Sequence, residues 1–450
     1  MLLSEREARR ITRKLLSCTT ADDAVVHVNS ESLSHLRFAA NAFTTSGVRE
    51  NVTAQITVWI DRKRGSASVN ELDDASLRAA VGRAEDLARV SPIDVEYLPT
   101  LGPQKYRPVK GYAEATARIA PEDRGRTVNQ AIEACEKAKV IGAGFYQVGA
   151  AASAMATKNG NFSYERSTIV SFAMTARTPD GGSSGYFLRN HFDVTKFDPK
   201  RVIEEAIRKA LESREPRTLD AGVYPVILEP QAVADLTGGF LMSSFDARRA
   251  DEGRSAFSAP GGKTRLGEKV FDGRLNIYSD PWHPLVPGSQ EAQDGLPAEM
   301  LYLVRNGVVE NLVYSRFWAQ KTGKAPTPGP VNTLIESSGP TSSLAEMIRS
   351  MDRGLLVSRF WYIRMVDPRT VLLTGLTRDG VWLVENGRIA CPVRNFRFNQ
   401  SIIEMLADGN IDLIGASERA GGSESQGRAA GLFPPLKLRA FHFTSQSEAV

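Results

Sequence analysis

The segment Val381-Trp-Leu-Val-Glu-Asn386-Gly387-Arg-Ile-Ala-Cys-Pro-Val393 places strand-forming residues on both sides of an Asn-Gly pair. Asn and Gly tolerate the positive φ angles that both central positions of a tight hairpin turn need. A second segment, Leu301–Val304 followed by Asn306-Gly307 and Val308–Val313, repeats this pattern. The last half of the chain is therefore predicted to be rich in antiparallel sheet.

The N-terminal half contains two loosely similar units. The first combines a helix near Ile11, alternating apolar residues over 51–60 and a helix capped by Asp73 or Asp74. The second combines a helix over 121–138, strand-like runs between 140 and 177, and a helix that starts at Asp198-Pro199. The shared order of helix, strands, glycine turn and Asp-capped helix indicates a weak internal duplication.

These patterns predict an α+β protein. Two loosely repeated helix and antiparallel-strand units are expected to form the N-terminal region, and a barrel-like antiparallel sheet with helices the C-terminal domain. The predicted boundaries are 1–110 for the first unit, 111–218 for the second and 219–450 for the C-terminal domain. The Gly- and Ser-rich stretch over 417–431 is expected to be a mobile loop.

Composition narrows the functional classes. The chain has 450 residues, a formal net charge of +4, 42% hydrophobic and 24% charged residues, which is ordinary for a globular protein. Such a charge disfavours a nucleic-acid coat or a polybasic membrane anchor. The three cysteines lie far apart, no secretory signal opens the chain, and no apolar run is long enough to span a bilayer. We expect a cytoplasmic protein with neither a nucleic acid nor a membrane as partner.

Motifs for catalysis are missing from the sequence. The five histidines lack a metal-ligating neighbour at helical spacing, and no Gly-x-Ser-x-Gly elbow or complete phosphate-binding loop is present. We therefore predict no catalytic residue, no bound metal and no cofactor. A metal site assembled from scattered residues such as His191, Asp280 and His283 remains an alternative.

Three stretches, taken in order, resemble the TldD/PmbA (TldE) family of peptide-processing proteins, which are also known as modulators of DNA gyrase. The first is Gly65-Ser-Ala-Ser-Val-Asn70-Glu-Leu-Asp-Asp74 with the helix from Leu77 to Leu87 after it. The second is Asp220-Ala-Gly-Val-Tyr-Pro-Val-Ile-Leu-Glu-Pro230. The third joins Arg353-Gly354-Leu-Leu-Val357, Asp367-Pro368 and the hairpin 381–393, and the resemblance spans about residues 20 to 415.

The resemblance also identifies a degenerate metal motif. Active TldD-type members carry His-Glu-x-x-x-His on a helix after the second stretch, and a cysteine near the C-terminus completes their zinc site. Here that helix reads Leu236-Thr-Gly238-Gly239-Phe240-Leu241-Met242-Ser243. Gly238 and Ser243 stand at the histidine positions and Gly239 at the glutamate position, while Cys391 is the last cysteine and belongs to the hairpin.

The resemblance therefore implies a zinc-less, PmbA/TldE-like subunit. It would pair with a TldD-like protease subunit as a heterodimer, or with itself as a homodimer, and would hold an unfolded peptide as an added strand. Two alternatives are a metallopeptidase with a divergent metal site and a non-enzymatic binding module of the gyrase-modulator type. Because the apolar residues Val233, Leu236, Phe240 and Leu241 share a helix face that must be buried, we expect this face at the subunit interface.

Overall fold

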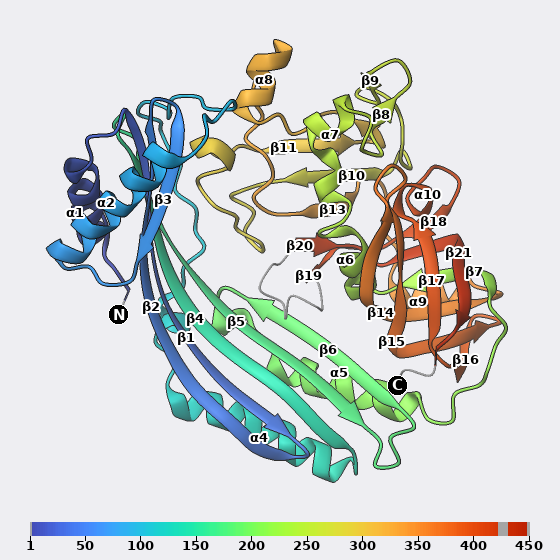
Figure 1. The fold of residues 1–450 in the computed structure, drawn as a ribbon. Coiled ribbons are helices and arrows are strands. Elements are labelled where there is room, and N and C mark those ends of the chain that lie inside the picture. The colour runs from blue at the N-terminus through green and yellow to red at the C-terminus, as the bar shows by residue number, and fades with distance from the viewer. Residues whose placement is uncertain (1, 422–430, 448–450) are drawn as a thin grey trace.

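The computed structural model describes residues 2–421 and 431–447. A long, curved sheet and a more compact C-terminal region lie side by side, with the C-terminal region on the concave side of the sheet (Figure 1). The predicted fold class is confirmed, since helices accompany sheets that are predominantly antiparallel.

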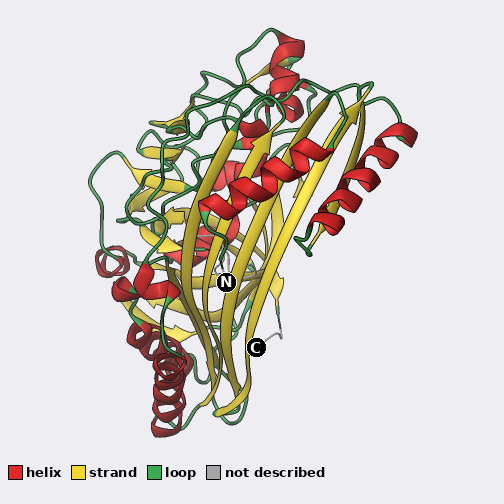
Figure 2. Cartoon of the chain, turned by 90° about the vertical axis from the view of Figure 1, so that its left-hand side faces the viewer, coloured by secondary structure: helices red, strands yellow, loops and turns green. Residues whose placement is uncertain are grey.

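The long sheet has six strands in the order β3-β2-β1-β4-β5-β6, and every neighbouring pair is antiparallel. The strands are β1 (Asp23–Ala39), β2 (Ala42–Ile60), β3 (Lys63–Val69), β4 (Ile141–Thr157), β5 (Phe162–Arg177) and β6 (Ser184–His191). The accompanying helices are α1 (Glu5–Cys18), α2 (Asp74–Val90), α3 (Glu114–Ala117), α4 (Pro121–Lys137) and α5 (Pro199–Glu212), with the 3₁₀ turn η1 (Val194–Lys196). Figure 2, viewed from the side of α1 and α2, shows helices lying across the outer face of the long strands.

The two N-terminal units have the same element order within this single sheet. Helix α1, strands β1 to β3 and helix α2 form one unit, and α4, β4 to β6 and α5 form the other. In each unit, a glycine in the third strand lies close to the backbone of the unit's last helix. A Cβ added to Gly65 in β3 would lie 2.0 Å from the carbonyl oxygen of Ala84 in α2, and one added to Gly185 in β6 would lie 2.3 Å from that of Ala206 in α5.

A closed barrel forms the centre of the C-terminal region. Its five strands follow the order β14-β7-β21-β17-β15, and pairing of β15 with β14 closes the ring. The bounds are β7 (Gly222–Leu228), β14 (Arg353–Asp367), β15 (Leu372–Glu385), β17 (Phe396–Ser401) and β21 (Leu436–Gln446); β16 (Arg388–Pro392) and β18 (Ile411–Ile414) pair outside the ring. Phe360, Phe396, Phe398 and Phe441 are fully buried in its core.

A second six-stranded sheet lies beside the barrel. Its order is β12-β11-β10-β13-β20-β19. The strands are β10 (Leu275–Ser279), β11 (Leu301–Arg305), β12 (Val308–Val309), β13 (Leu334–Ser337), β19 (Glu418–Ala420) and β20 (Gly431–Phe433), and β8 (Ser258–Ala259) with β9 (Lys263–Thr264) forms a separate ribbon. The helical elements are α6 (Pro230–Thr237), η2 (Met242–Phe245), α7 (Ala247–Asp251), η3 (Gln293–Gly295), α8 (Arg316–Thr322), α9 (Leu344–Arg349) and α10 (Ile402–Met405).

Both predicted Asn-Gly hairpins are confirmed. The φ angles are 49° and 78° at Asn306 and Gly307, and 49° and 75° at Asn386 and Gly387. The loop predicted over 417–431 needs a correction, because Glu418–Ala420 pairs with Gly431–Phe433 as strands β19 and β20. The remaining part of that loop prediction, residues 422–430, lies outside the described residues.

A buried ion pair and a buried hydrogen bond connect the long sheet and its helices to the barrel. Lys209 of α5 donates to Glu229, which follows β7, with Nζ 2.5 Å from Oε2, and also to the Ser358 hydroxyl of β14. Nearby, Arg359 of β14 lies 2.5 Å from Asp379 of β15, which also accepts a hydrogen bond from Ser184 of β6. These charged side chains are buried. Because they come from both regions of the protein, they fix the position of the barrel against the sheet.

None of the helices within residues 2–421 and 431–447 combines the length and the apolar character needed to cross a bilayer.

We expect Gly65→Ala and Gly185→Ala each to destabilise the protein by about 1–3 kcal/mol, since the new Cβ would overlap helix backbone. Gly82→Ala is the matched control: Gly82 lies exposed within α2 with nothing near its Cβ position, so this change should stabilise by up to about 1 kcal/mol. Denaturant unfolding followed by circular dichroism measures all three. Equal effects at the three positions would contradict the close packing.

We also expect Lys209→Met and Glu229→Met to destabilise the protein by about 3–5 kcal/mol each, because either change leaves the other charge buried without its partner. The double variant Lys209→Met/Glu229→Met should recover most of that loss, since it buries no unpaired charge. Unfolding free energies of the four proteins form a double-mutant cycle. Additive losses in the double variant would show that the two charges do not act as a pair.

Candidate functional site

The segment that aligns with the metal motif forms a turn rather than one continuous helix. Pro230 occupies the first turn of α6, as a helix start favours, but the helix ends at Thr237. Gly238 caps its C-terminus with helical φ and ψ angles, and the chain then turns into η2. The two glycines therefore follow the helix, which corrects the prediction of a helix that runs through to Ser243.

The apolar side chains of this segment are covered by the chain itself. Val233, Leu236 and Leu241 have no exposed surface and belong to the main C-terminal core. The apolar helix face predicted to lie at a subunit interface is therefore buried against other residues of the same chain. A second subunit could not contact these three side chains. Accessible surface remains at Gly239 and Ser243, while Phe240 is partly buried.

The turn lines a groove of about 660 Å³ between the long sheet and the C-terminal region. One wall comes from β1, β4 and β5, with Leu33, Gly149 and Ile169 at one level of the sheet. The opposite wall combines Gly238 and Met242 with two loops over 286–289 and 330–333. Of the three positions that align with the metal motif, Gly238 lines the groove, whereas Gly239 and Ser243 do not.

The groove does not provide a zinc site. Gly238 and Gly239 have no side-chain donor atoms, and the Ser243 hydroxyl donates to the carbonyl oxygen of Phe240 at 2.9 Å. Across residues 2–421 and 431–447, no three His, Cys, Asp or Glu side chains gather in a way that could hold a metal ion. A zinc ion needs at least three protein ligands, so the residues of this groove do not fit one.

The scattered residues of the alternative metal site have other contacts. His191 accepts a hydrogen bond at Nδ1 from the Asp193 amide at 2.9 Å, and its ring stacks on Phe192. Burial and the nearby charge of Arg419 lower the pKa of His191 to about 4, so its ring is neutral at pH 7. His283 accepts from the Leu285 amide. These contacts orient local backbone, and the described structure does not gather the predicted residues into a metal site.

Two of the polar and charged side chains that line the groove, Gln147 and Arg419, lack complete pairing within the described residues. Glu31 and Arg419 are its ionisable residues, and Glu31 is paired with Arg49 at 2.6 Å. Arg419 forms no ion pair with a described Asp or Glu residue. Gln147 of β4 is 5% exposed, yet its amide makes no hydrogen bond to a described residue. Sequence reasoning missed both, because Arg419 falls in the stretch predicted to be a loop and Gln147 lies in an otherwise apolar strand.

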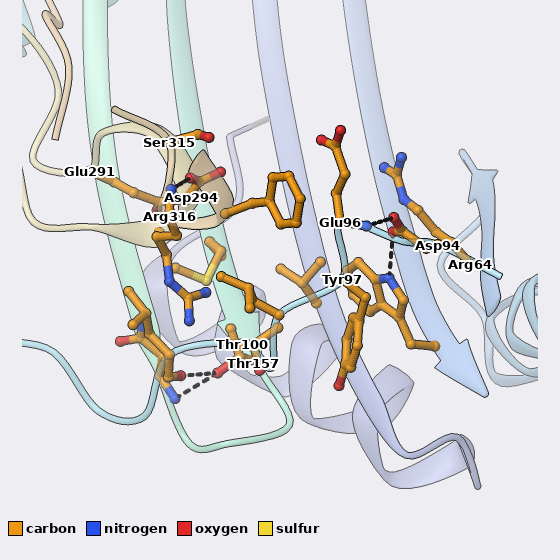
Figure 3. A pocket seen from close by; sticks show the side chains of 18 of the residues that line it. Arg64, Asp94, Glu96, Tyr97, Thr100, Thr157, Glu291, Asp294, Ser315 and Arg316 are labelled. Carbon is orange, nitrogen blue, oxygen red and sulfur yellow. Dashed lines mark hydrogen bonds between the residues drawn. The ribbon is translucent and has the colours of Figure 1, made fainter. Parts of the chain in front are cut away.

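A second cavity, of about 510 Å³, lies between the sheet, the connector over 94–101 and the start of α8. Figure 3 shows Asp94 on one side and Asp294 and Arg316 on the other. Asp94 accepts hydrogen bonds from the Trp59 ring and the Glu96 amide, while Arg316 donates to the carbonyl oxygen of Pro99 at 2.8 Å. These contacts hold the connector in place against the sheet and the start of α8.

Family comparison agrees with this architecture. The PmbA/TldA metallopeptidase central domain matches residues 112–214, and the C-terminal domain of the same family matches residues 221–445. Because these matches cover most of the chain, the protein belongs to the PmbA/TldD metallopeptidase family.

Curated relatives are distant. A metalloprotease from Synechocystis sp. is 24% identical over 263 residues, which cover 54% of this chain and 53% of the relative. A metalloprotease from Methanothermobacter thermautotrophicus is 26% identical over 259 residues, covering 54% of this chain and 52% of the relative. The chain thus spans about half the length of the curated relatives it matches.

Solved structures share the whole fold. TldE from Thermococcus kodakarensis superposes with a TM-score of 0.85 at 18% identity, covering 97% of this chain and 99% of the other. A proposed modulator of DNA gyrase from Thermotoga maritima superposes with a TM-score of 0.83 at 18% identity, covering 97% and 100%. At such low identity, these likenesses establish the fold.

Proposed function

We propose that this chain is a non-catalytic, zinc-less subunit of a PmbA/TldD-type metallopeptidase complex that processes unfolded or modified peptides. The observation that carries the proposal is the turn over 238–243, which borders the groove but provides no set of metal ligands. The metalloprotease relatives and the TldE fold neighbour support the connection with peptide hydrolysis. The chain would contribute binding surface, and a TldD-like partner would contribute the metal.

The proposal includes an unpaired strand edge, in β2, to which the peptide could bind as an added strand. Strand β3 pairs with β2 only from Ala54 to Ile60, whereas β1 pairs with β2 from Ala42 to Trp59. Within the described residues, no strand covers the outer side of positions 42–53. An unpaired strand edge offers its N–H and C=O groups to another extended chain.

This open edge adjoins the groove. Glu31 and Leu33 of β1 line the groove, and their partners in β2, Asn51 and Arg49, belong to the uncovered part of the strand. Neighbouring strands lie about 4.8 Å apart. A peptide added along β2 would therefore run two strand spacings, about 10 Å, from the groove-lining part of β1.

The subunit role predicts that the purified chain alone contains no stoichiometric zinc and does not cleave an unfolded casein-type substrate. Cleavage should appear when the chain is mixed with a paralogue from the same organism that carries His-Glu-x-x-x-His. Elemental analysis and a chelator-controlled protease assay measure the two properties.

The alternative of an independent metallopeptidase gives the opposite result. The isolated chain would then contain zinc, and its chelator-sensitive cleavage would fall in His191→Ala or His283→Ala. An unchanged cleavage rate in both variants would instead indicate a contaminating protease.

The open edge predicts different effects of proline at two adjacent positions, Thr45→Pro and Ser46→Pro. Successive N–H groups of a strand point in opposite directions, so one variant removes a bond to β1 and the other removes an outward donor. The variant that remains fully folded should bind an unfolded peptide at least about tenfold more weakly. Fluorescence anisotropy measures binding, with Thr45→Ala and Ser46→Ala as controls. Unchanged binding in the folded proline variant would exclude this edge.

A further inference from the structure

The groove contains a cation without a described counter-charge. Arg419 follows Glu418 in β19, and Nε donates to the Asn190 side chain at 2.7 Å while Nη1 donates to the carbonyl oxygen of Leu285. Nη2 has no hydrogen-bond partner among the described residues. Burial lowers the pKa of Arg419 to about 10, which still leaves the guanidinium charged at neutral pH. Its neighbour Glu418 is already paired with Arg189 and Arg201.

The unpaired amide of Gln147 is a second, independent observation. Gln147 lies on β4 between Tyr146 and Val148, whose side chains pack in the core under α4 and α5. Since neighbouring strand residues face opposite sides, Gln147 faces the concave side, where it lines the groove. The Gln147 amide is not among the fully buried atoms of the described residues that lack a hydrogen-bond partner, so it is reached from the open groove. An open groove is where a bound molecule could provide that partner.

We propose that the groove binds the carboxylate group of a peptide, with Arg419 contacting the carboxylate and Gln147 the adjacent peptide main chain. The inference rests on the proposed peptide-processing function and specifies its substrate class. A peptide bound in this way lies in the groove against β4, which is a different binding mode from addition to the outer edge of β2.

A carboxylate suits this groove better than a phosphate does. The planar guanidinium group matches the two oxygens of a carboxylate, and a single unpaired positive charge balances its single negative charge. A phosphate dianion would retain excess negative charge, because the other ionisable residue of the groove is Glu31. The groove volume of about 660 Å³ can hold a short extended segment, although the Leu33 side chain covers Gly149.

Four fluorescent peptides of one unfolded sequence test the proposal on the full chain. Their C-terminus is either a free acid or an amide, and each form is made with Gln or Glu at one internal position. For the Gln-containing pair, we expect the free acid to bind wild-type protein about 10–100-fold more tightly than the amide, in the range of a charge-assisted hydrogen bond. If the internal Glu restores tight binding to the amide, the groove accepts a side-chain carboxylate as well.

Three variants separate recognition from folding. Arg419→Gln should abolish the preference for a carboxylate while retaining the weaker binding of the amide, and Arg419→Lys should keep part of the preference. Gln147→Leu should weaken the binding of the acid peptide and of the amide peptide by a similar factor. Arg353→Gln, which changes an exposed arginine of β14, is the matched control and should behave as wild type.

Several outcomes would overturn the proposal. Equal binding of the acid, amide and Glu-containing peptides by wild-type protein would refute carboxylate recognition, although peptide binding as such would survive. A preference for the acid that persists in Arg419→Gln would assign recognition to another site. If no peptide binds, both this inference and the peptide-holding part of the proposed function fail, while assembly with a metal-containing partner is judged separately by the protease assay.

Discussion

The groove depends on buried polar contacts between the long sheet with its helices and the barrel, namely the Lys209–Glu229 ion pair and the hydrogen bond from Ser184 to Asp379. Lys209 and Glu229 come from α5 and the end of β7, and Arg359 and Asp379 come from two strands of the barrel. One wall of the groove belongs to the sheet and the other to the C-terminal region, so its width is set by how these two bodies dock. Buried charges tolerate little displacement, because a shift that separates the partners leaves each one desolvated and unpaired.

Under the proposed function, the groove would serve as a binding surface in a family fold whose metal ligands are missing from the turn after α6. The turn after α6 still borders the groove, but its glycines and Ser243 provide neither a ligand set nor a base for water activation. Binding requires less than hydrolysis, namely an accessible strand edge and a few polar groups. The sheet side of the groove has both features: β2 has an uncovered strand edge, and Gln147 has a polar side chain.

Short sequence patterns correctly predicted features that depend only on neighbouring residues, such as turns and helix caps. The Asn-Gly turns need positive φ angles, and the Asp73 cap of α2 needs only the neighbouring backbone amides of Ala75 and Ser76, so both are predicted from a few residues. The pairing of β1 with β4 joins residues as distant as Val25 and Thr157, and no short pattern encodes that contact. The same limit hid Arg419, whose environment is formed by residues from distant parts of the chain.

The repeated order of helix, three strands and helix has a consequence for how such a sheet could have arisen. A single unit would leave the edge of its first strand bare, and β1 and β4 are those first strands. Equivalent strands that pair in antiparallel fashion are what a two-fold axis generates, as in a symmetric dimer of one unit. Joining two copies in one chain makes that association independent of concentration. It also frees the copies to diverge, so that β6 can lie against the barrel while β2 keeps an uncovered edge.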